Sequence, residues 1–329
     1  MKWYVYQRDD LYESKVLRDG LGFGMELIPP RHSWMGMLTS QIECVADPDE
    51  ADLFLVPQIL NVLWNPLPRP YLDAMASAWL ESLPWFEEAK ARHVIFLLGD
   101  PCDLPESCSR SIVFMPSCRR GSTAMAMHYF AELPDRAPLP INECPIDVGF
   151  QGSTVTGSGV RRRVFEALNR GTSYRIHCRN TGGYFHMSHA PDQLARLAAE
   201  YRDHLNQSRF IVCPRGDGLS SLRFFEALAW GRIPILIADQ TQLPLEDVIP
   251  YDEFVVRIPE AEVDHWEDWV TEFLDDHPDL DRASRLAAET SRTWFTFDAL
   301  ARFVHASVAA RGLAGRGAAR FAESVIYER

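Results

Sequence analysis

The sequence has no apolar run long enough to cross a membrane, and it has few cysteines. Its apolar stretches, such as residues 53–56 and 233–237, have the length of a strand, far below the roughly 20 residues that a membrane span needs. Seven cysteines among 329 residues are too few for a disulfide scaffold, and the odd number leaves a thiol unpaired. No secretory signal is recognisable after Met1, where the residues alternate as in a strand. These absences predict a protein of a reducing compartment with no transmembrane segment.

Positive charge is also scarce. Lys and Arg number 33 against 46 Asp and Glu, which gives a formal net charge of −13 with histidine neutral. Such a surface repels the backbone of nucleic acids, so a nucleic-acid partner is not expected. Apolar side chains, in contrast, make up 47% of the chain, enough to bury one large core or two ordinary ones, and global disorder is excluded.

Short β-branched or aromatic runs alternate with segments of helical period, which predicts an α/β protein with largely parallel sheets. A Pro-rich passage around residues 134–146 interrupts this rhythm. We therefore expect a first domain at residues 1–140, a second at 141–300 and a C-terminal helical tail at 301–329. The expected strands are residues 3–6, 53–56, 93–98 and 112–114, then 148–151, 174–177, 210–213, 233–237 and 254–257.

Residues 191–208 have the amphipathic pattern of a helix that covers a sheet. Their apolar positions share one helical face, at Leu194, Leu197, Ala198, Tyr201 and Leu205. The polar positions fall elsewhere, so this face is expected to point to the core.

The most informative stretch is residues 209–239, which predict a strand, a glycine turn, a helix and a second strand. Gly216 and Gly218 are expected to allow positive φ and close approach of the backbone. Ser220 and Ser221 are expected to cap the helix. The free N–H groups and positive dipole end of such a helix bind anions, so a diphosphate would fit there.

Charged side chains accompany this helix start. Arg215 and Arg223 are placed to add charge-assisted hydrogen bonds to phosphate oxygens. Glu226 follows Arg223 by three residues on the same helical face, and its carboxylate can accept hydrogen bonds from both hydroxyls of a ribose. A glycine turn between strand and helix also occurs in many α/β proteins without a phosphate site, but this set of side chains favours nucleotide binding.

A second glycine lies at the end of an earlier strand. Gly152 closes residues 148–151 and is expected to let a sugar or phosphate of a bound ligand approach. The triplet Arg161 to Arg163 follows shortly after, and one of the three, with Arg161 as the first choice, is expected to point inward.

Residues 209–260 resemble the donor-site signature of the exostosin family of glycosyltransferases, glycosyltransferase family 47. The similarity includes the Leu-Pro-Leu at residues 243–245 and the strand that ends at Glu260. Further motifs similar to those of the family follow in its order, at residues 47–57, 92–96 and 150–152. The resemblance covers residues 1–300 and leaves the C-terminal end unplaced.

The resemblance implies the GT-B fold, in which two Rossmann-like domains with mostly parallel sheets face a central cleft. The second domain of such enzymes binds a sugar nucleotide and the first presents the acceptor. Family members commonly use a UDP-sugar, invert the anomeric carbon and lack a metal-binding Asp-x-Asp motif. Carried over by match, Glu226 would hold the ribose, and Arg215, Arg223 and the turn at residues 216–221 would hold the diphosphate.

The spacing of glutamates bears on the stereochemistry. Many retaining GT-B enzymes carry two glutamates eight positions apart. The second is followed by Ala and later by Gly and Pro, as Glu226 is here. Gly218 stands at the earlier position, which fits an inverting enzyme; a different donor geometry is the alternative.

An inverting transfer also needs a general base. Asp100 is the first choice because it follows the strand at residues 93–98, and parallel sheets gather their ligands at the carboxyl ends of strands. His32, Asp103 and His128 are the reserves. Arginines and the helix dipole can stabilise the leaving diphosphate, so no metal or other cofactor is expected.

The sequence therefore predicts an inverting, metal-independent glycosyltransferase that moves a sugar from a UDP-sugar to a carbohydrate or glycoconjugate acceptor. One alternative is a catalytically inactive exostosin-like partner or binding subunit, since some exostosin-type proteins work in homo- or hetero-oligomers. Another is a nucleotide-sugar epimerase of GT-B fold. The Ala- and Arg-rich composition and the lack of an anchor favour a bacterial cytoplasmic enzyme, free or peripheral at the inner membrane face, whereas eukaryotic relatives are usually Golgi membrane proteins.

Overall fold

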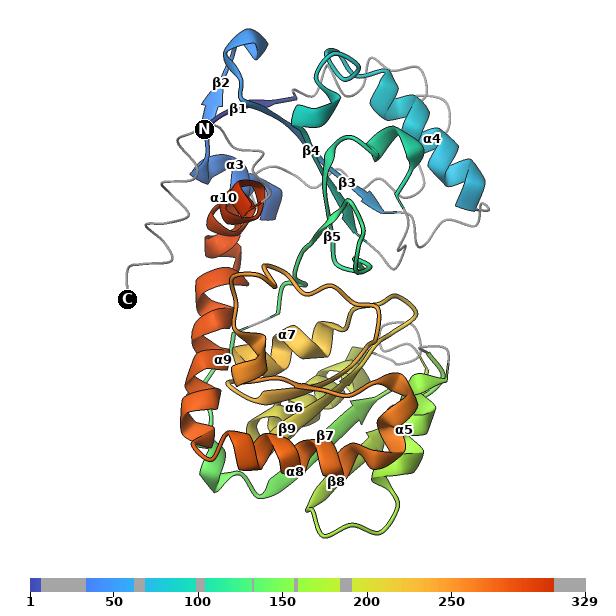
Figure 1. Cartoon of the computed structure of the whole chain (residues 1–329), viewed down its shortest axis with the longest axis vertical. Helices are drawn as coiled ribbons and strands as arrows, with labels where there is room; N and C mark the ends of the chain where they lie inside the picture. Colours follow the sequence, from blue (N-terminus) through green and yellow to red (C-terminus); the bar gives the residue numbers. More distant parts are fainter. Residues whose placement is uncertain are drawn as a thin grey trace. The chain divides into compact units, whose positions relative to one another are not determined.

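Two parallel sheets organise the chain, which was analysed as a computed structural model (Figure 1). The structure describes residues 1–6, 34–61, 69–98, 104–131, 133–156, 159–183 and 191–310. Each sheet belongs to one unit. The first unit takes in residues 1–127, 242–245 and the described residues from 297 onward, and the second takes in residues 128–241 and 246–296.

The sheet of the first unit has the strand order β2-β1-β3-β4-β5-β6, and each neighbouring pair is parallel. Its strands are β1 Lys2–Val5, β2 Glu43–Val45, β3 Leu53–Asn61, β4 His93–Leu98, β5 Ile112–Met115 and β6 Met125–Ala126. Its helices are α3 Trp34–Gln41, α4 Arg69–Glu81 and α10 Leu300–Ala310. Four consecutive residues of β4, Val94 to Leu97, are fully buried, as expected of a parallel strand covered on both faces.

The end of the described chain returns to the first unit. On α10, Phe303 packs against Phe114 with ring centroids 5.9 Å apart, and the His305 ring stacks on Trp3 at 5.8 Å. The described part of the expected C-terminal tail, residues 301–310, is thus part of a core. The division between the units falls at residues 127 and 128, ahead of the expected 140 and 141.

The sheet of the second unit has the order β11-β10-β9-β7-β8, again with every neighbouring pair parallel. Its strands are β7 Ile146–Gly152, β8 Ile176–Asn180, β9 Ser208–Pro214, β10 Ile233–Ile237 and β11 Val256–Arg257. Its helices are α5 Val160–Leu168, α6 Pro191–Gln207, α7 Leu222–Ala229, α8 Trp266–Asp276 and α9 Leu280–Trp294. The predicted α/β class and the mostly parallel sheets are confirmed.

Helices cover both faces of this second sheet. Val148 of β7 pairs with Phe210 of β9, and Phe210 meets Phe273 of α8, so this face is covered by α8. The next residue of β7, Gly149, lies on the opposite face, where His204 of α6 packs so closely that a Cβ at Gly149 would lie 2.2 Å from its ring. The predicted helix at residues 191–208 therefore covers the sheet, as α6.

Among the described residues, no helix is both long and apolar enough to span a membrane.

Candidate functional site

Strands β7 and β9 are parallel neighbours, so their carboxyl ends, at Gly152 and Pro214, lie at the same edge of the second sheet. This edge is where open α/β sheets bind ligands. The predicted glycine turn follows β9, and α7 begins directly after it. Most of the side chains expected at the donor site are gathered here by the topology of this unit.

The turn at residues 215–221 is braced by Arg161, which lies in the first turn of α5. Nε of Arg161 donates to the carbonyl oxygen of Arg215 at 3.1 Å, and Nη1 donates to Oγ1 of Thr156 at 2.8 Å. A Cβ at Gly216 would lie 3.3 Å from Nη2 of Arg161. Arg161 thus points inward, as predicted, and it contacts both the turn and Thr156.

Gly216 and Gly218 are not among the glycines with positive φ, so neither uses the left-handed backbone that glycine allows. Close approach accounts for Gly216 instead, because its bare Cα leaves room for the Arg161 guanidinium. The N–H of Gly216 closes the turn by donating to the carbonyl oxygen of Ser220 at 3.3 Å.

Ser221 is the N-cap residue of α7, with extended φ −139 and ψ 121, at the position predicted for the cap. Its side chain makes no capping hydrogen bond, so the predicted side-chain cap is wrong. Only its backbone carbonyl contributes, by accepting from the N–H of Phe224 at 3.1 Å. Ser220 contributes through its backbone to the turn.

Arg223 crosses the carboxyl end of β7. Its Nη2 donates to the carbonyl oxygen of Gln151 at 2.8 Å, and its Cζ lies 5.1 Å from the centre of the Phe150 ring. Nε and Nη1 of the same guanidinium are buried and have no hydrogen-bond partner. Buried donors of a charged group without acceptors are costly, so this guanidinium is suited to receive an anion.

Gly152 lies directly against the side chain of Arg223. A Cβ at this glycine would lie 2.3 Å from Nη2 of Arg223, closer than real atoms approach. The glycine that the sequence assigns to approach of the donor therefore leaves room for the arginine.

Arg215 is already engaged by a carboxylate. Its Nε donates to Oε1 of Glu260 at 2.6 Å, and its Nη2 donates to Oε2 at 3.2 Å. The backbone N–H of Glu260 donates in turn to Oδ1 of Asp239 at 2.7 Å. Two of the donors that the sequence assigns to a diphosphate therefore bind Glu260. The sequence did not indicate this pair, because 45 residues separate its members.

Glu226 lies one turn after Arg223 on α7 and is half-buried. Oε2 of Glu226 accepts a hydrogen bond of 2.6 Å from the hydroxyl of Tyr201 on α6. Burial, together with the Glu226 carboxylate, raises the pKa of Tyr201, so the phenol stays protonated and donates. The sequence placed Tyr201 on the apolar face of its helix, and no sequence signal connects it to Glu226.

Of the residues predicted as candidates for the general base, His128 is the one that the structure describes. His128 is fully buried, with Phe130 edge-on at 4.7 Å and Phe295 at 5.1 Å between ring centroids. Burial lowers the pKa of His128 to about 3, so the ring has the surroundings of a core residue, which argues against its predicted role. Asp100, His32 and Asp103 lie outside the described residues, and their roles stay predictions.

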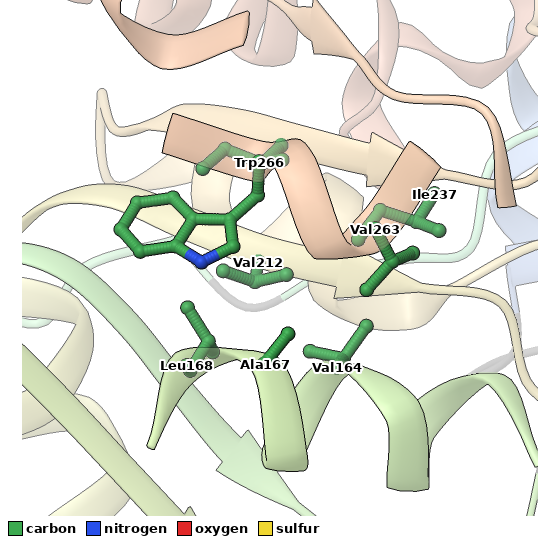
Figure 2. Close-up of a pocket in the computed structure, with 8 residues that line it drawn as sticks. Val164, Ala167, Leu168, Val212, Ile237, Val263 and Trp266 are labelled. Atoms are coloured by element: carbon green, nitrogen blue, oxygen red, sulfur yellow. The ribbon is translucent and has the colours of Figure 1, made fainter. Parts of the chain in front are cut away.

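An apolar gap in the second unit is no candidate for a nucleotide. It lies between α5, β9, β10 and the segment that leads into α8 (Figure 2). Its lining is Val164, Ala167, Leu168, Val212, Ile235, Ile237, Val263 and Trp266. None of these side chains is charged, so the gap offers nothing to bind a diphosphate.

Within the part of the chain that the structure describes, no three or more His, Cys, Asp and Glu side chains are grouped as metal ligands would be. The charges at the carboxyl edge of the second sheet are instead arginines and their carboxylate partners.

Comparison with known protein families finds a match that includes this edge of the sheet. Residues 142–272 match the family model described as the Exostosin GT47 domain. This stretch, less than half of the chain, is thus similar to the exostosin GT47 domain, and we call it the exostosin domain below. This exostosin domain contains β7 to β11, α5 to α7 and all the residues discussed above that the sequence predicts for a donor site.

Curated relatives of the chain are plant proteins. A probable glucuronosyltransferase of Oryza sativa subsp. japonica is 38% identical over 93 residues, which are 28% of this chain and 21% of that protein. The probable arabinosyltransferase ARAD1 of Arabidopsis thaliana is 24% identical over 283 residues, which are 78% of this chain and 56% of that protein. The chain thus spans between about a fifth and about half of the length of these relatives. The bacterial, cytoplasmic origin stays a prediction.

Among solved structures, the chain is similar to a glycosyltransferase from Rickettsia africae, with a TM-score of 0.43 and 8% identity over 89% of this chain and 88% of that one.

Proposed function

We propose that the protein is a GT-B glycosyltransferase that transfers a sugar from a UDP-sugar to a carbohydrate or glycoconjugate acceptor, with inversion and without a metal ion. The exostosin domain would bind the donor at the carboxyl edge of its sheet. The named relatives are described as glucuronosyl- and arabinosyltransferases, which supports a nucleotide-sugar donor.

The observation that carries this proposal is the guanidinium of Arg223. Two of its nitrogens are buried without a hydrogen-bond partner, at the sheet edge where α/β proteins bind ligands. The first turn of α7 begins one residue earlier, and the side chain of its N-cap residue makes no hydrogen bond to the helix N–H groups. A diphosphate would satisfy both kinds of donor, which makes it the anion that fits best.

Arg223 and the start of α7 would also assist the departure of the diphosphate. As the bond between the anomeric carbon and the diphosphate breaks, negative charge grows on the leaving oxygen. Arg223 and the start of α7 are fixed before the reaction and would stabilise that charge without a metal ion. The acceptor hydroxyl must lose its proton to a base on the opposite side of the sugar; Asp100 remains our first candidate and His32 a reserve.

Replacing Arg223 with alanine tests the donor site. We expect the affinity for UDP to fall by about 1.5 to 3 kcal/mol, the value of a charge-assisted hydrogen bond, in calorimetric titrations. Arg136→Ala is the matched control, because Arg136 pairs with Asp203 on the surface. Chelator is expected to leave UDP affinity unchanged. Unchanged affinity in Arg223→Ala, or binding that requires a divalent ion, would contradict the proposed site.

Gly152→Ala tests the role of Arg223 in UDP binding in a second way. The added methyl group would occupy the space of Nη2, and the long side chain of Arg223 can move away, so the fold should survive with a loss of stability of about 1 kcal/mol. UDP affinity should fall nearly as far as in Arg223→Ala, and the double variant should be no weaker than Arg223→Ala alone. Additive losses in the double variant would show that Gly152 acts independently of Arg223.

A further inference from the structure

The contact between Tyr201 and Glu226 joins two helices at the donor site. Tyr201 comes from α6 and Glu226 from α7, and the 2.6 Å hydrogen bond between them spans 25 residues of sequence. Tyr201 is only partly exposed, and its ring lies 6.2 Å from that of His204, which packs on Gly149 of β7. The phenol is therefore held in place by α6 and the sheet, whereas a glutamate side chain has three rotatable bonds.

A second group competes for the Glu226 carboxylate. Arg223 precedes Glu226 by three residues on α7, a spacing at which oppositely charged side chains form ion pairs. Yet Nε and Nη1 of Arg223 have no hydrogen-bond partner, so the carboxylate of Glu226 does not occupy them. The hydrogen bond that the structure shows for this carboxylate comes instead from Tyr201.

We propose that Tyr201 is a positioning residue for the donor nucleotide: its hydroxyl holds Glu226 toward the ribose and away from Arg223, which stays available for the diphosphate. This inference rests on the proposed function. A carboxylate has about four lone-pair positions, and the hydrogen bond from Tyr201 takes one of them.

Removing the hydroxyl of Tyr201 tests whether this group positions Glu226 or only supports the fold. In Tyr201→Phe, the Glu226 side chain can turn and pair with Arg223, so affinity for UDP should fall about tenfold, the weight of one charge-assisted hydrogen bond. Affinity for 2′-deoxy-UDP should fall less, because this nucleotide has no 2′-hydroxyl and so no contact between that hydroxyl and Glu226 to lose. The preference of the protein for UDP over 2′-deoxy-UDP should therefore shrink in this variant.

A double-variant cycle shows whether Tyr201 acts through Glu226. The amide side chain in Glu226→Gln cannot form an ion pair with Arg223, so Tyr201→Phe should change UDP affinity less than about twofold in that background. Tyr174→Phe is the matched control: the Tyr174 hydroxyl lies in the same unit and contacts Oγ1 of Thr271 at 2.9 Å. This control should bind both nucleotides like the unmodified protein.

The outcomes distinguish this inference from the function on which it rests. If the unmodified protein does not bind UDP, the proposed function fails and the inference with it. If it binds UDP and Tyr201→Phe weakens both nucleotides by the same factor, or weakens neither, the positioning role is overturned while the donor site stands. Equal losses from Tyr201→Phe in the unmodified protein and in the Glu226→Gln variant would also overturn it, because Tyr201 would then act independently of the carboxylate.

Discussion

Replacing Arg232 with methionine is expected to lower the free energy of unfolding of the second unit by about 3 to 5 kcal/mol. Arg232 is fully buried, just before β10. Its Nε donates to the carbonyl oxygen of Leu205 at 2.9 Å, its Nη2 to that of Asn206 at 2.9 Å, and its Nη1 to that of Leu139 at 3.0 Å. Methionine fills similar space but leaves these buried acceptors without a donor.

The position of these carbonyls explains the size of the effect. Leu205 and Asn206 are in the last turn of α6, where carbonyl groups have no partner within the helix and the helix dipole favours a cation. Leu139 belongs to the segment that leads into β7. A single guanidinium thus completes a helix end and ties it to an incoming segment. Its loss affects both at once.

Urea unfolding followed by circular dichroism measures the change, and hydrogen exchange of peptides from the end of α6 locates it. Arg170→Met is the control, because the Arg170 side chain is 61% exposed and pairs with Asp264 on the surface. Such exposed pairs contribute about 0 to 1 kcal/mol. A loss below about 1 kcal/mol in Arg232→Met would show that water replaces the guanidinium at these carbonyls.

The second large effect is a loss of stability in mild acid. His93, His128 and His204 are 0%, 0% and 3% exposed. Burial lowers the pKa of His93 to about 4 and that of His128 to about 3. Burial, with His177 and Arg223 nearby, lowers the pKa of His204 to about 3. All three are therefore neutral in the folded protein at the pH values at which free histidines gain a proton.

The sign follows from proton linkage. Histidines in the unfolded chain have a pKa near 6.5, so below that pH the unfolded state binds protons that the folded state does not. The contribution of these histidines to the free energy of unfolding is fully present above about pH 6.5. It is lost as the pH falls toward their lowered pKa values in the folded state. Each such proton contributes about 1.4 kcal/mol per pH unit. Between about pH 6 and pH 4.5, we expect a slope of about 3 kcal/mol per pH unit for the second unit, which contains His128 and His204.

Urea unfolding at a series of pH values gives this slope directly. His128→Phe should reduce the slope of the second unit by about half, because phenylalanine suits the aromatic surroundings of His128 and does not titrate. His265→Ala should leave it unchanged, since the His265 side chain is 66% exposed. If His128→Phe unfolds with the same slope as the unmodified protein, His128 is not the source of the proton uptake.

Much of the framework could be predicted from local sequence. Residues 148–151, 210–213 and 233–237 were expected as strands and lie within β7, β9 and β10, because short β-branched runs between polar turns favour buried parallel strands. The helix expected at residues 191–208 is α6, which ends at Gln207. The turn at Gly216 and the helix that presents Arg223 and Glu226 were also predicted, since glycine, cap and i,i+3 signals are all local.

Partnerships between distant residues could not be predicted in this way. Glu260 holds Arg215, Tyr201 holds Glu226, and Arg232 binds the end of α6, each across many residues of sequence. Gly152 was expected to admit the donor, whereas the structure fills its space with Arg223. The sequence by itself determined the α/β class, the elements of the proposed donor site and their residue types, because these depend on periodicity and turn chemistry. Only the tertiary structure decided which charges meet and which stay without a partner, because that depends on how the parallel strands bring their carboxyl ends together.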